Sequence, residues 1–416
     1  MKKIIFALTS MIILTNCNSE QSLTTDQSNK QRYGAYDIST DPLVSASPVA
    51  NIQLPELPTN PVFATFNNAY KTLAADNHKI GLDDPNNSDK YFFKVVGSAT
   101  QTLDIAFFDI DDATATQAIL SAKSRGVNVR VVTDSDNLKD KVTNTLPRKA
   151  IEDFKAAGIT VVDDKKSSFM HHKFMVIDNK AVWAGSTNLT TNSIYEHNNN
   201  NVYIQSVALA TNYNTEFTKL FVNNDFGPES GQVPNPVVSV GDATIKTYFS
   251  PYGGTQQAVV NEIKKATKSI KFMIFAFTDQ NIAQAMIDKK RQGVNVEGIF
   301  DSCSINKYSW YYPLKDEQIP TYRDGNQALL HSKTIIIDDQ TVITGSFNFS
   351  NKAETGNNED TLIINSPSLG IQYLAEYDRL KFASLNNKNI PPYDHPACNH
   401  GNSLIGSQST DSKEEK

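Results

Sequence analysis

The feature that most constrains the fold of this chain is an internal repeat. The segment SRGVNVRVVTD (124–134) matches RQGVNVEGIFD (291–301), at an offset of 167 residues. Further along, HHKFMVIDNKAVWAGSTN (171–188) matches HSKTIIIDDQTVITGSFN (331–348), at an offset of 160. The change in offset means that one loop differs by seven residues between the copies. A repeat of this length is too long for a solenoid and predicts two related domains.

Each copy has the same order of expected elements. An apolar segment (LDIAFFDIDD, 103–112; IKFMIFAFTD, 270–279) is followed by a helix-like stretch that ends at a glycine, and then by a second apolar strand. Strand, helix, strand is the order of a βαβ unit, which predicts a parallel sheet covered by helices. The expected fold class is therefore α/β, with two pseudo-symmetric domains that each contain a mainly parallel β-sheet flanked by helices.

Composition suggests where the domains begin and end. Residues 61–226 and 246–385 contain the two copies, and a Pro- and Gly-rich segment between them predicts a linker at 227–245. Residues 17–60 are rich in Ser, Thr, Asn, Gln and Pro, which predicts a flexible spacer. Residues 386–416 are predicted to form a polar tail.

The first 16 residues are typical of an export signal peptide. Lysines precede an apolar run from Ile4 to Leu14, which is too short to span a bilayer as a mature helix. The following LTNC resembles a bacterial lipoprotein cleavage site, although Asn16 stands where Gly, Ala or Ser is usual. This resemblance implies an exported cell-envelope protein, in the periplasm or outer membrane, that is anchored to the membrane by lipid on Cys17. The alternative is an ordinary signal peptide that is cut nearby.

Charge and cysteine content narrow the functional classes. The net charge is −6, or −8 without Lys2 and Lys3 of the signal, and no block rich in Lys and Arg is present. A dedicated nucleic-acid-binding protein usually has a basic surface, although an acidic protein can still contain a local basic cleft. Apart from Cys17 the chain contains only Cys303 and Cys398, which could form a disulfide in an oxidising compartment. Their spacing leaves that pairing open.

Both copies of the repeat fit the pattern H-x-K-x(4)-D-x(6)-G-S-x-N. The matching residues are His171, Lys173, Asp178, Gly185, Ser186 and Asn188 in the first copy, and His331, Lys333, Asp338, Gly345, Ser346 and Asn348 in the second. Side chains alternate between the two faces of a strand, so His171 and Lys173 share one face and His172 points to the other. The second copy has Ser332 in place of His172. We therefore expect His172 to be a packing or surface residue.

The paired motif resembles that of the phospholipase D superfamily, over about residues 61–385. The resemblance implies that the two halves pack so that their motifs form one active site at the domain interface. It further implies a monomer without an obligate protein partner, which cleaves a phosphodiester through a phosphohistidine intermediate and uses no metal or other cofactor. One histidine would attack phosphorus, and the other would protonate the leaving alkoxide and then activate water or an acceptor alcohol.

The other motif residues have expected roles within this chemistry. They are the lysines Lys173 and Lys333, the asparagines Asn188 and Asn348, and the serines Ser186 and Ser346. The lysines would stabilise charge on the phosphoryl oxygens, and the asparagine amides would donate hydrogen bonds to the same oxygens. The serines would add hydroxyl or backbone donors, or only cap their loops. Asp178 and Asp338 belong to the catalytic motif, but at the ends of strands we expect them to brace the neighbouring loop.

The two halves differ 28 residues after each motif histidine, where Glu359 stands in the second half and Asn199 in the first. Members of the superfamily often have a carboxylate here that orients an active-site histidine, and in tyrosyl-DNA phosphodiesterases it serves the other half. If this carries over, Glu359 orients His171 and keeps it neutral, whereas Asn199 faces His331. We therefore expect His171 to be the nucleophile and His331 the general acid.

The motif predicts the reaction and leaves the substrate open. A phospholipid-directed phospholipase D is favoured by the predicted membrane anchor and the acidic net charge. The alternative is a non-specific endonuclease, because GSFNFSNKAETGNNED (345–360) resembles compact bacterial nucleases of the superfamily. A phosphatidyl transferase and an inactive binding module are also considered. The aromatic segment NKYSWYYPL (306–314) could lie at a lipid interface, stack on bases or simply pack, so it does not discriminate.

Overall fold

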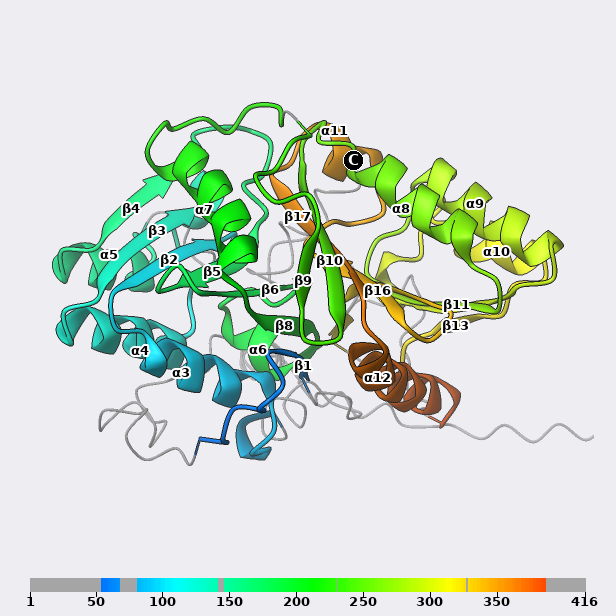
Figure 1. The fold of residues 1–416 in the computed structure, drawn as a ribbon, viewed down its shortest axis with the longest axis horizontal. Coiled ribbons are helices and arrows are strands. Elements are labelled where there is room, and N and C mark those ends of the chain that lie inside the picture. Colours follow the sequence, from blue (N-terminus) through cyan, green and yellow to red (C-terminus); the bar gives the residue numbers. More distant parts are fainter. Residues whose placement is uncertain (1–53, 68–80, 141–145, 230, 327, 387–416) are drawn as a thin grey trace, which may run out of the picture.

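The structure is a computed structural model that describes residues 54–67, 81–140, 146–229, 231–326 and 328–386. Within these residues two α/β halves lie side by side, each built on one large β-sheet (Figure 1). The predicted signal peptide with Cys17, most of the predicted spacer, and the tail with Cys398 lie outside the described residues.

The first half contains a seven-stranded sheet of order β1-β8-β6-β5-β2-β3-β4. The strands of this sheet are β1 (Val62–Phe66), β2 (Thr102–Phe107), β3 (Asn128–Thr133), β4 (Thr160–Asp163), β5 (Lys173–Ile177), β6 (Ala181–Gly185) and β8 (Asn200–Gln205). The short strand β7 (His197–Asn198) lies outside it. The helices of the first half are α3 (Ser88–Ser98), α4 (Ala113–Ser124), α5 (Lys149–Ala156), α6 (Thr191–Tyr195) and α7 (Val207–Phe221), with a 3-10 helix at Ser135–Asn137.

The second half contains an eight-stranded sheet of order β13-β12-β11-β15-β16-β17-β10-β9. The strands of this sheet are β9 (Val238–Val240), β10 (Ala243–Ser250), β11 (Ser269–Ile274), β12 (Asn295–Phe300), β13 (Thr321–Arg323), β15 (Lys333–Ile337), β16 (Thr341–Gly345) and β17 (Glu359–Asn365). The short strand β14 (Leu329–Leu330) lies outside it. The helices of the second half are α8 (Thr255–Lys265), α9 (Gln280–Arg291), α10 (Tyr311–Asp316), α11 (Asn351–Thr355) and α12 (Pro367–Asn386), with a 3-10 helix at Ser302–Ser304.

The fold class is α/β with two pseudo-symmetric domains, as expected, but the sheets are not mainly parallel. Parallel pairing within them is confined to β2-β3-β4 and β11-β12-β13. The other neighbours in both sheets, including the motif strands β5-β6 and β15-β16, pair antiparallel. Antiparallel strands need only a short turn between them, whereas parallel strands need a crossover. The βαβ order therefore predicted one side of each sheet correctly and missed the hairpins at its centre.

The predicted linker at 227–245 is also too long. β9 and the first residues of β10 fall inside it and form a hairpin at the edge of the second sheet. Val238 and Ile245 pair across this hairpin and are both buried, which explains why the segment joins the sheet. The irregular connection after α7 therefore ends near residue 237, and the second half begins with β9.

Helices cover both faces of each sheet. One face of the first sheet is covered by α3, α4 and α5, and one face of the second sheet by α8, α9 and α10 (Figure 1). Each of these two layers has its own hydrophobic core. On the other face, α7 and α12 share one core with residues from both sheets. Helix α12 also bonds directly to the first half, because Gln372 accepts a hydrogen bond from the Ala64 N–H at 3.0 Å. The two halves are therefore packed as one body around a common apolar core.

Two short backbone bridges connect the halves next to the motif histidines. Strand β14 pairs parallel with β7, and the His331 N–H donates to the Asn198 carbonyl at 2.9 Å. In the related position Met170 bridges to Asn358, and the His171 N–H donates to the Asn358 carbonyl at 2.9 Å. Each histidine is therefore held by the backbone of the opposite half.

The predictions about the cysteines and the membrane concern regions that the structure describes only in part. Cys303 takes part in a disulfide bond. Cys398 lies outside the described residues, so the pairing of these two cysteines stays a prediction. None of the described helices is both long enough and apolar enough to cross a bilayer.

Each motif strand ends in a tight turn that is braced by its aspartate. Asp178 and Asn179 have φ angles of 51° and 54°, a left-handed conformation that Asp and Asn adopt more readily than most residues. The Asp178 carboxylate accepts hydrogen bonds from the backbone N–H groups of residues 100–102 at 2.7–3.1 Å. Asp338 makes the same contacts with residues 267–269. Asp178 and Asp338 therefore connect the motif hairpins to the neighbouring strands.

This position corrects the grouping of Asp178 and Asp338 with the catalytic residues. Each lies five residues beyond the motif lysine, at the opposite end of its strand, which is roughly 16 Å away at about 3.3 Å per residue. Partial burial raises the pKa of each carboxyl, but the hydrogen bonds lower it more, so the pKa lies below its ordinary value. The aspartates are therefore charged structural residues.

We predict that Asp178→Asn lowers the free energy of unfolding at pH 7 by about 1–3 kcal/mol, because an amide accepts these hydrogen bonds less well than a carboxylate. Because the folded pKa is depressed, the advantage of the wild-type protein should be lost as the pH falls below about 4 and through the folded pKa. Urea unfolding at neutral and acidic pH measures both effects.

The exposed Asp316, in helix α10, offers a control. Asp316→Asn should leave the free energy of unfolding nearly unchanged. Equal destabilisation by the two variants, or a loss of turnover by folded Asp178→Asn protein, would contradict the bracing role.

Candidate active site

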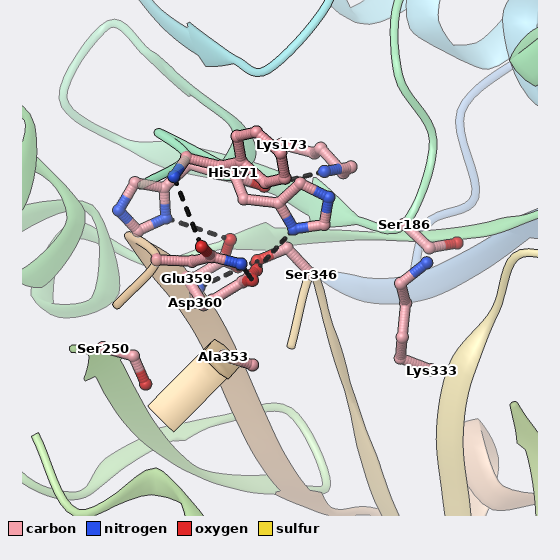
Figure 2. Close-up of polar contacts among 12 residues, drawn as sticks. His171, Lys173, Ser186, Ser250, Lys333, Ser346, Ala353, Glu359 and Asp360 are labelled. Carbon is pink, nitrogen blue, oxygen red and sulfur yellow. Dashed lines mark hydrogen bonds and ion pairs between the residues drawn. The ribbon is translucent and has the colours of Figure 1, made fainter. Parts of the chain in front are cut away.

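The structure brings the two motifs together at the junction of the halves. β5 and β15 begin with Lys173 and Lys333, and His171 and His331 stand two residues before them. The four side chains are buried, with at most 1% of their surface exposed. Figure 2 shows the residues of both halves converging on this junction. The expected single site at the domain interface is therefore present as a cluster of buried polar side chains.

His171 is oriented by a carboxylate from the opposite half. Its Nδ1 lies 2.7 Å from Oε2 of Glu359, which also accepts a hydrogen bond from the Ser346 hydroxyl at 2.6 Å (Figure 2). The Asn357 amide donates to the other carboxylate oxygen at 3.2 Å. Because a carboxylate accepts, Nδ1 carries the proton and Nε2 is the nitrogen with a lone pair. The contact that the 28-residue spacing predicted is present.

His331 has the same arrangement with an uncharged partner. Its Nδ1 lies 3.0 Å from Oδ1 of Asn199 and 3.1 Å from the carbonyl oxygen of Ser186. The Ser186 hydroxyl donates to the same Asn199 oxygen at 2.8 Å, and the Asn199 amide donates to the Ser193 carbonyl at 2.9 Å. The two histidines therefore differ in the charge of the side chain that orients them, and His331 also contacts a backbone carbonyl.

The serines of the motif donate hydrogen bonds within the protein, and their binding to phosphate stays a prediction. The hydroxyls of Ser186 and Ser346 donate to the residues that orient the histidines. Their backbone N–H groups donate to the carbonyl oxygens of Asn200 and Asp360. The hydroxyl of each serine therefore holds the orienting residue, and its N–H holds the residue that follows.

The glycine before each serine allows this close packing. A Cβ atom on Gly185 would lie 2.2 Å from the carbonyl oxygen of Asn200, and one on Gly345 would lie 2.2 Å from that of Asp360. No side chain fits at that distance. Glycine therefore lets β6 and β16 approach the backbone segments that carry the orienting residues.

Each motif lysine is held between a carbonyl oxygen and an aromatic ring. The ammonium groups of Lys173 and Lys333 donate to the carbonyl oxygen of the histidine two residues earlier, both at 2.7 Å. They lie 5.1 Å and 4.9 Å from the ring centroids of Phe108 and Phe275, which is within cation–π range. The same rings contact the motif histidines, with centroids 5.0 Å and 4.9 Å apart.

Phe108 and Phe275 are residues that the motif search missed. They stand 167 residues apart, at matching positions of the first repeated strand, so the alignment of the repeats contained the signal. Asp134 and Asp301 are a second such pair, because their carboxylates accept hydrogen bonds from the backbone just before each motif histidine, at 2.9 Å and 3.0 Å. These residues position the reactive side chains from outside the motif.

Asn188 and Asn348 lie in the loops that follow β6 and β16, with 6% and 1% of their surface exposed. The backbone N–H of Asn188 donates to the Ser193 hydroxyl at 2.9 Å. Their binding to phosphate stays a prediction. Within the described ranges no group of three or more His, Cys, Asp and Glu side chains is arranged to hold a metal ion.

The aromatic segment at 306–314 divides between core and surface. Tyr311 is buried at the start of α10, and the Trp310 indole N–H donates to the Thr278 carbonyl at 3.3 Å. Tyr308 and Tyr312 are 60% and 52% exposed. Packing therefore explains Tyr311 and the half-buried Trp310, and the exposed Tyr308 and Tyr312 are available to contact a lipid or a base.

The electrostatic environment keeps His171 neutral at pH 7. Burial is the largest cause and lowers the pKa of the imidazole, whereas the charge of Glu359 raises it. The expectation that Glu359 keeps His171 neutral is therefore wrong, because a nearby negative charge favours the protonated ring. The cations of Lys173 and Lys333 lower the pKa further, and the resulting pKa is about 4. A neutral imidazole with its lone pair on Nε2 is the state that a nucleophile requires.

Comparison with known proteins agrees with this site. A family model described as "Cardiolipin synthase, PLD-like domain" matches residues 93–221 and 259–381, which is more than half of the chain and one copy in each half. A phospholipase D of Rickettsia prowazekii (strain Madrid E) is 31% identical over 170 residues, covering 40% of this chain and 83% of that protein. A mitochondrial cardiolipin hydrolase of Chlamydomonas reinhardtii is 33% identical over 130 residues, covering 31% of this chain and 56% of that protein.

Among solved structures, a phosphatidylserine synthase of Haemophilus influenzae Rd KW20 matches with a TM-score of 0.57 and 11% identity, over 88% of this chain and 97% of that one. At this identity the match shows a common fold and no more. The family model and the Rickettsia relative carry the assignment further. The model matches both repeats, and 83% of the relative is matched at 31% identity. The chain therefore belongs to the phospholipase D superfamily and is a phosphodiester hydrolase.

Proposed function

We propose that this enzyme hydrolyses phospholipids as a phospholipase D, with His171 as the nucleophile and His331 as the general acid. The unequal pairing of the two histidines, one with a carboxylate and one with an amide, carries the assignment of roles. Glu359 stabilises the positive charge that develops on the His171 ring as Nε2 attacks phosphorus. The neutral Asn199 gives less stabilisation to protonated His331, which is therefore the better proton donor.

The reaction then has two steps. In the first, a bond forms between Nε2 of His171 and phosphorus, the bond to the leaving oxygen breaks, and His331 gives its proton to that oxygen. In the second, neutral His331 takes a proton from water, the water oxygen attacks phosphorus, and the nitrogen–phosphorus bond breaks. Lys173 and Lys333 are placed to stabilise the negative charge on the phosphoryl oxygens in both transition states.

Two observations and one prediction support phospholipid as the substrate. The relatives include proteins named phospholipase D and mitochondrial cardiolipin hydrolase. The predicted lipid anchor on Cys17 would hold the enzyme at a membrane surface, and the net charge of −6 is unfavourable for general binding to nucleic acid. The similarity of residues 345–360 to nucleases of the superfamily makes nucleic acid the alternative that an assay has to exclude.

A side-by-side assay in the presence of a chelator tests the substrate. We predict head-group release from phosphatidylcholine or cardiolipin liposomes at a rate at least about tenfold above cleavage of single- or double-stranded DNA or RNA. The variant His171→Asn should be inactive on every substrate and serves as the control. Cleavage of nucleic acid alone would overturn the lipid proposal, and loss of all activity with chelator would contradict a metal-independent reaction.

The assignment of the nucleophile is tested with a phosphodiester that carries a p-nitrophenyl leaving group. This leaving group needs no protonation, so His331→Asn should still release about one equivalent of p-nitrophenol and then stall, because the second step lacks its base. Peptide mapping of alkali-quenched protein should place the phosphoryl group on His171. A burst from His171→Asn, with the label on His331, would reverse the roles.

The depressed pKa of His171 predicts the acid limb of the pH profile. The imidazole attacks only when neutral, so kcat/KM should rise with pH through about 4, well below an ordinary histidine. Because Glu359 raises this pKa, Glu359→Gln should move the limb to lower pH and reduce the plateau by about 10–100-fold. A limb near pH 6.5 in the wild-type enzyme, or an unmoved limb in Glu359→Gln, would contradict the assignment.

A further inference from the structure

The second histidine of the motif, His172, lies on the far side of the strand from the reacting groups, as expected, and is fully buried. Its ring is held between two carboxylates. Nε2 is 3.1 Å from Glu216 on α7, and Nδ1 is 3.4 Å from Asp360 on β17. The Tyr213 hydroxyl donates to the other oxygen of Asp360 at 3.1 Å. His172 therefore links the first motif to a helix of its own half and to a strand of the other half.

His172 is charged in this environment. Burial lowers the pKa of its imidazole, but the hydrogen bonds and charges of Asp360 and Glu216 raise it more, to about 9. The ion pair of Lys219 with Glu229 lies beside this group, since Glu229 acts electrostatically on both Glu216 and His172. An imidazolium between two carboxylates holds both of them more firmly than a neutral residue would.

The position of His172 connects it to the active site. His171 and His172 are consecutive, and so are their partners Glu359 and Asp360. Consecutive residues of an extended strand point to opposite faces. Two histidine–carboxylate contacts therefore join the same two backbone segments, one on each face. A shift of β17 that lengthens the contact of Asp360 also moves Glu359 relative to His171.

The second half lacks this ionic contact. Ser332 and Asn200 occupy the positions of His172 and Asp360, and the Asn200 amide donates to the hydroxyls of Thr344 and Tyr373 at 2.6 Å and 2.7 Å. The chain therefore has a neutral network behind the histidine that faces an amide. It has an ionic one behind the histidine that faces a carboxylate.

The glutamate on the helix behind each motif also has a different charged partner in the two repeats. Glu376 on α12 is the repeat equivalent of Glu216, and its carboxylate forms a two-bond ion pair with Arg379, at 2.7 Å for each bond. It therefore has a cationic partner within its own helix. Glu216 has its charged partner on the motif strand.

We propose that His172 is a positioning residue for the first half-reaction, which holds Glu359 against His171 by clamping β17 and α7 to the start of β5. The inference rests on the proposed role of His171 as the nucleophile. It predicts that loss of the clamp loosens the orientation of His171 without removing any group that touches the substrate.

The test measures hydrolysis of the p-nitrophenyl phosphodiester, which reports the attack of His171 and does not depend on the natural substrate. For His172→Ser we expect kcat to fall by about tenfold or more, with KM within about twofold. The acid limb of kcat/KM should move to lower pH, in the direction expected for Glu359→Gln. His172→Gln, which keeps amide donors but lacks the positive charge, should show a smaller change in the same direction.

A double variant separates the clamp from simple packing. His172→Ser alone leaves two buried carboxylates without their cation, whereas His172→Ser with Asp360→Asn recreates the neutral pair of the second half. The double variant should therefore recover part of the lost rate. Ser332→Ala is the matched control in the other repeat and should leave kcat and the acid limb unchanged. Thermal unfolding of each variant gives the folded fraction.

The experiments separate a failure of the role of His172 from a failure of the proposed function. If Glu359→Gln moves the acid limb and His172→Ser does not, His172 only packs and the inference is wrong. The inference is also wrong if the loss of rate in His172→Ser is equal at every pH and matches the loss of folded protein. It is wrong as well if the double variant is no faster than the single one. If Glu359→Gln itself leaves the limb in place, the assigned role of His171 fails first.

Discussion

The contact between His171 and Glu359 is the interaction on which the active site depends. The two residues are 188 positions apart, come from different halves, and are both fully buried. A buried carboxylate is costly unless it is hydrogen-bonded, and here Ser346, Asn357 and the histidine supply its partners. This arrangement exists only when the halves are packed, so the common core around α7 and α12 is a condition of catalysis as well as of stability.

A duplicated fold gives two equivalent histidines, and a small number of substitutions makes them unequal. Glu359 and Asn199 orient the rings with and without charge. Behind them, an imidazolium bound to carboxylates contrasts with a serine and an amide. A phosphoryl transfer in two steps needs one neutral nucleophile and one proton donor, so this asymmetry suits the chemistry. The motif residues themselves are the same in both halves.

Sequence reasoning predicted the parts of the site that depend on spacing within a strand or between repeats. Examples are the common strand face of His171 and Lys173 and the contact of Glu359 with His171. The predicted directions of the motif strands were wrong, because a βαβ order says nothing about the strands that follow it. The left-handed turn at Asp178–Asn179 makes those strands an antiparallel hairpin. The contacts of the serine hydroxyls with Asn199 and Glu359 could not be predicted, because they depend on how distant segments pack, which no local pattern reveals.

The central claim is that Glu359 keeps a proton on Nδ1 of His171 and leaves Nε2 free to attack phosphorus. Nitrogen-15 NMR of the ring nitrogens in histidine-labelled enzyme, with His171 assigned by substitution, measures this directly. The account predicts a neutral ring with the proton on Nδ1 at pH 7, and titration only well below pH 6.5. A proton on Nε2 at pH 7, or titration near pH 6.5, would contradict it.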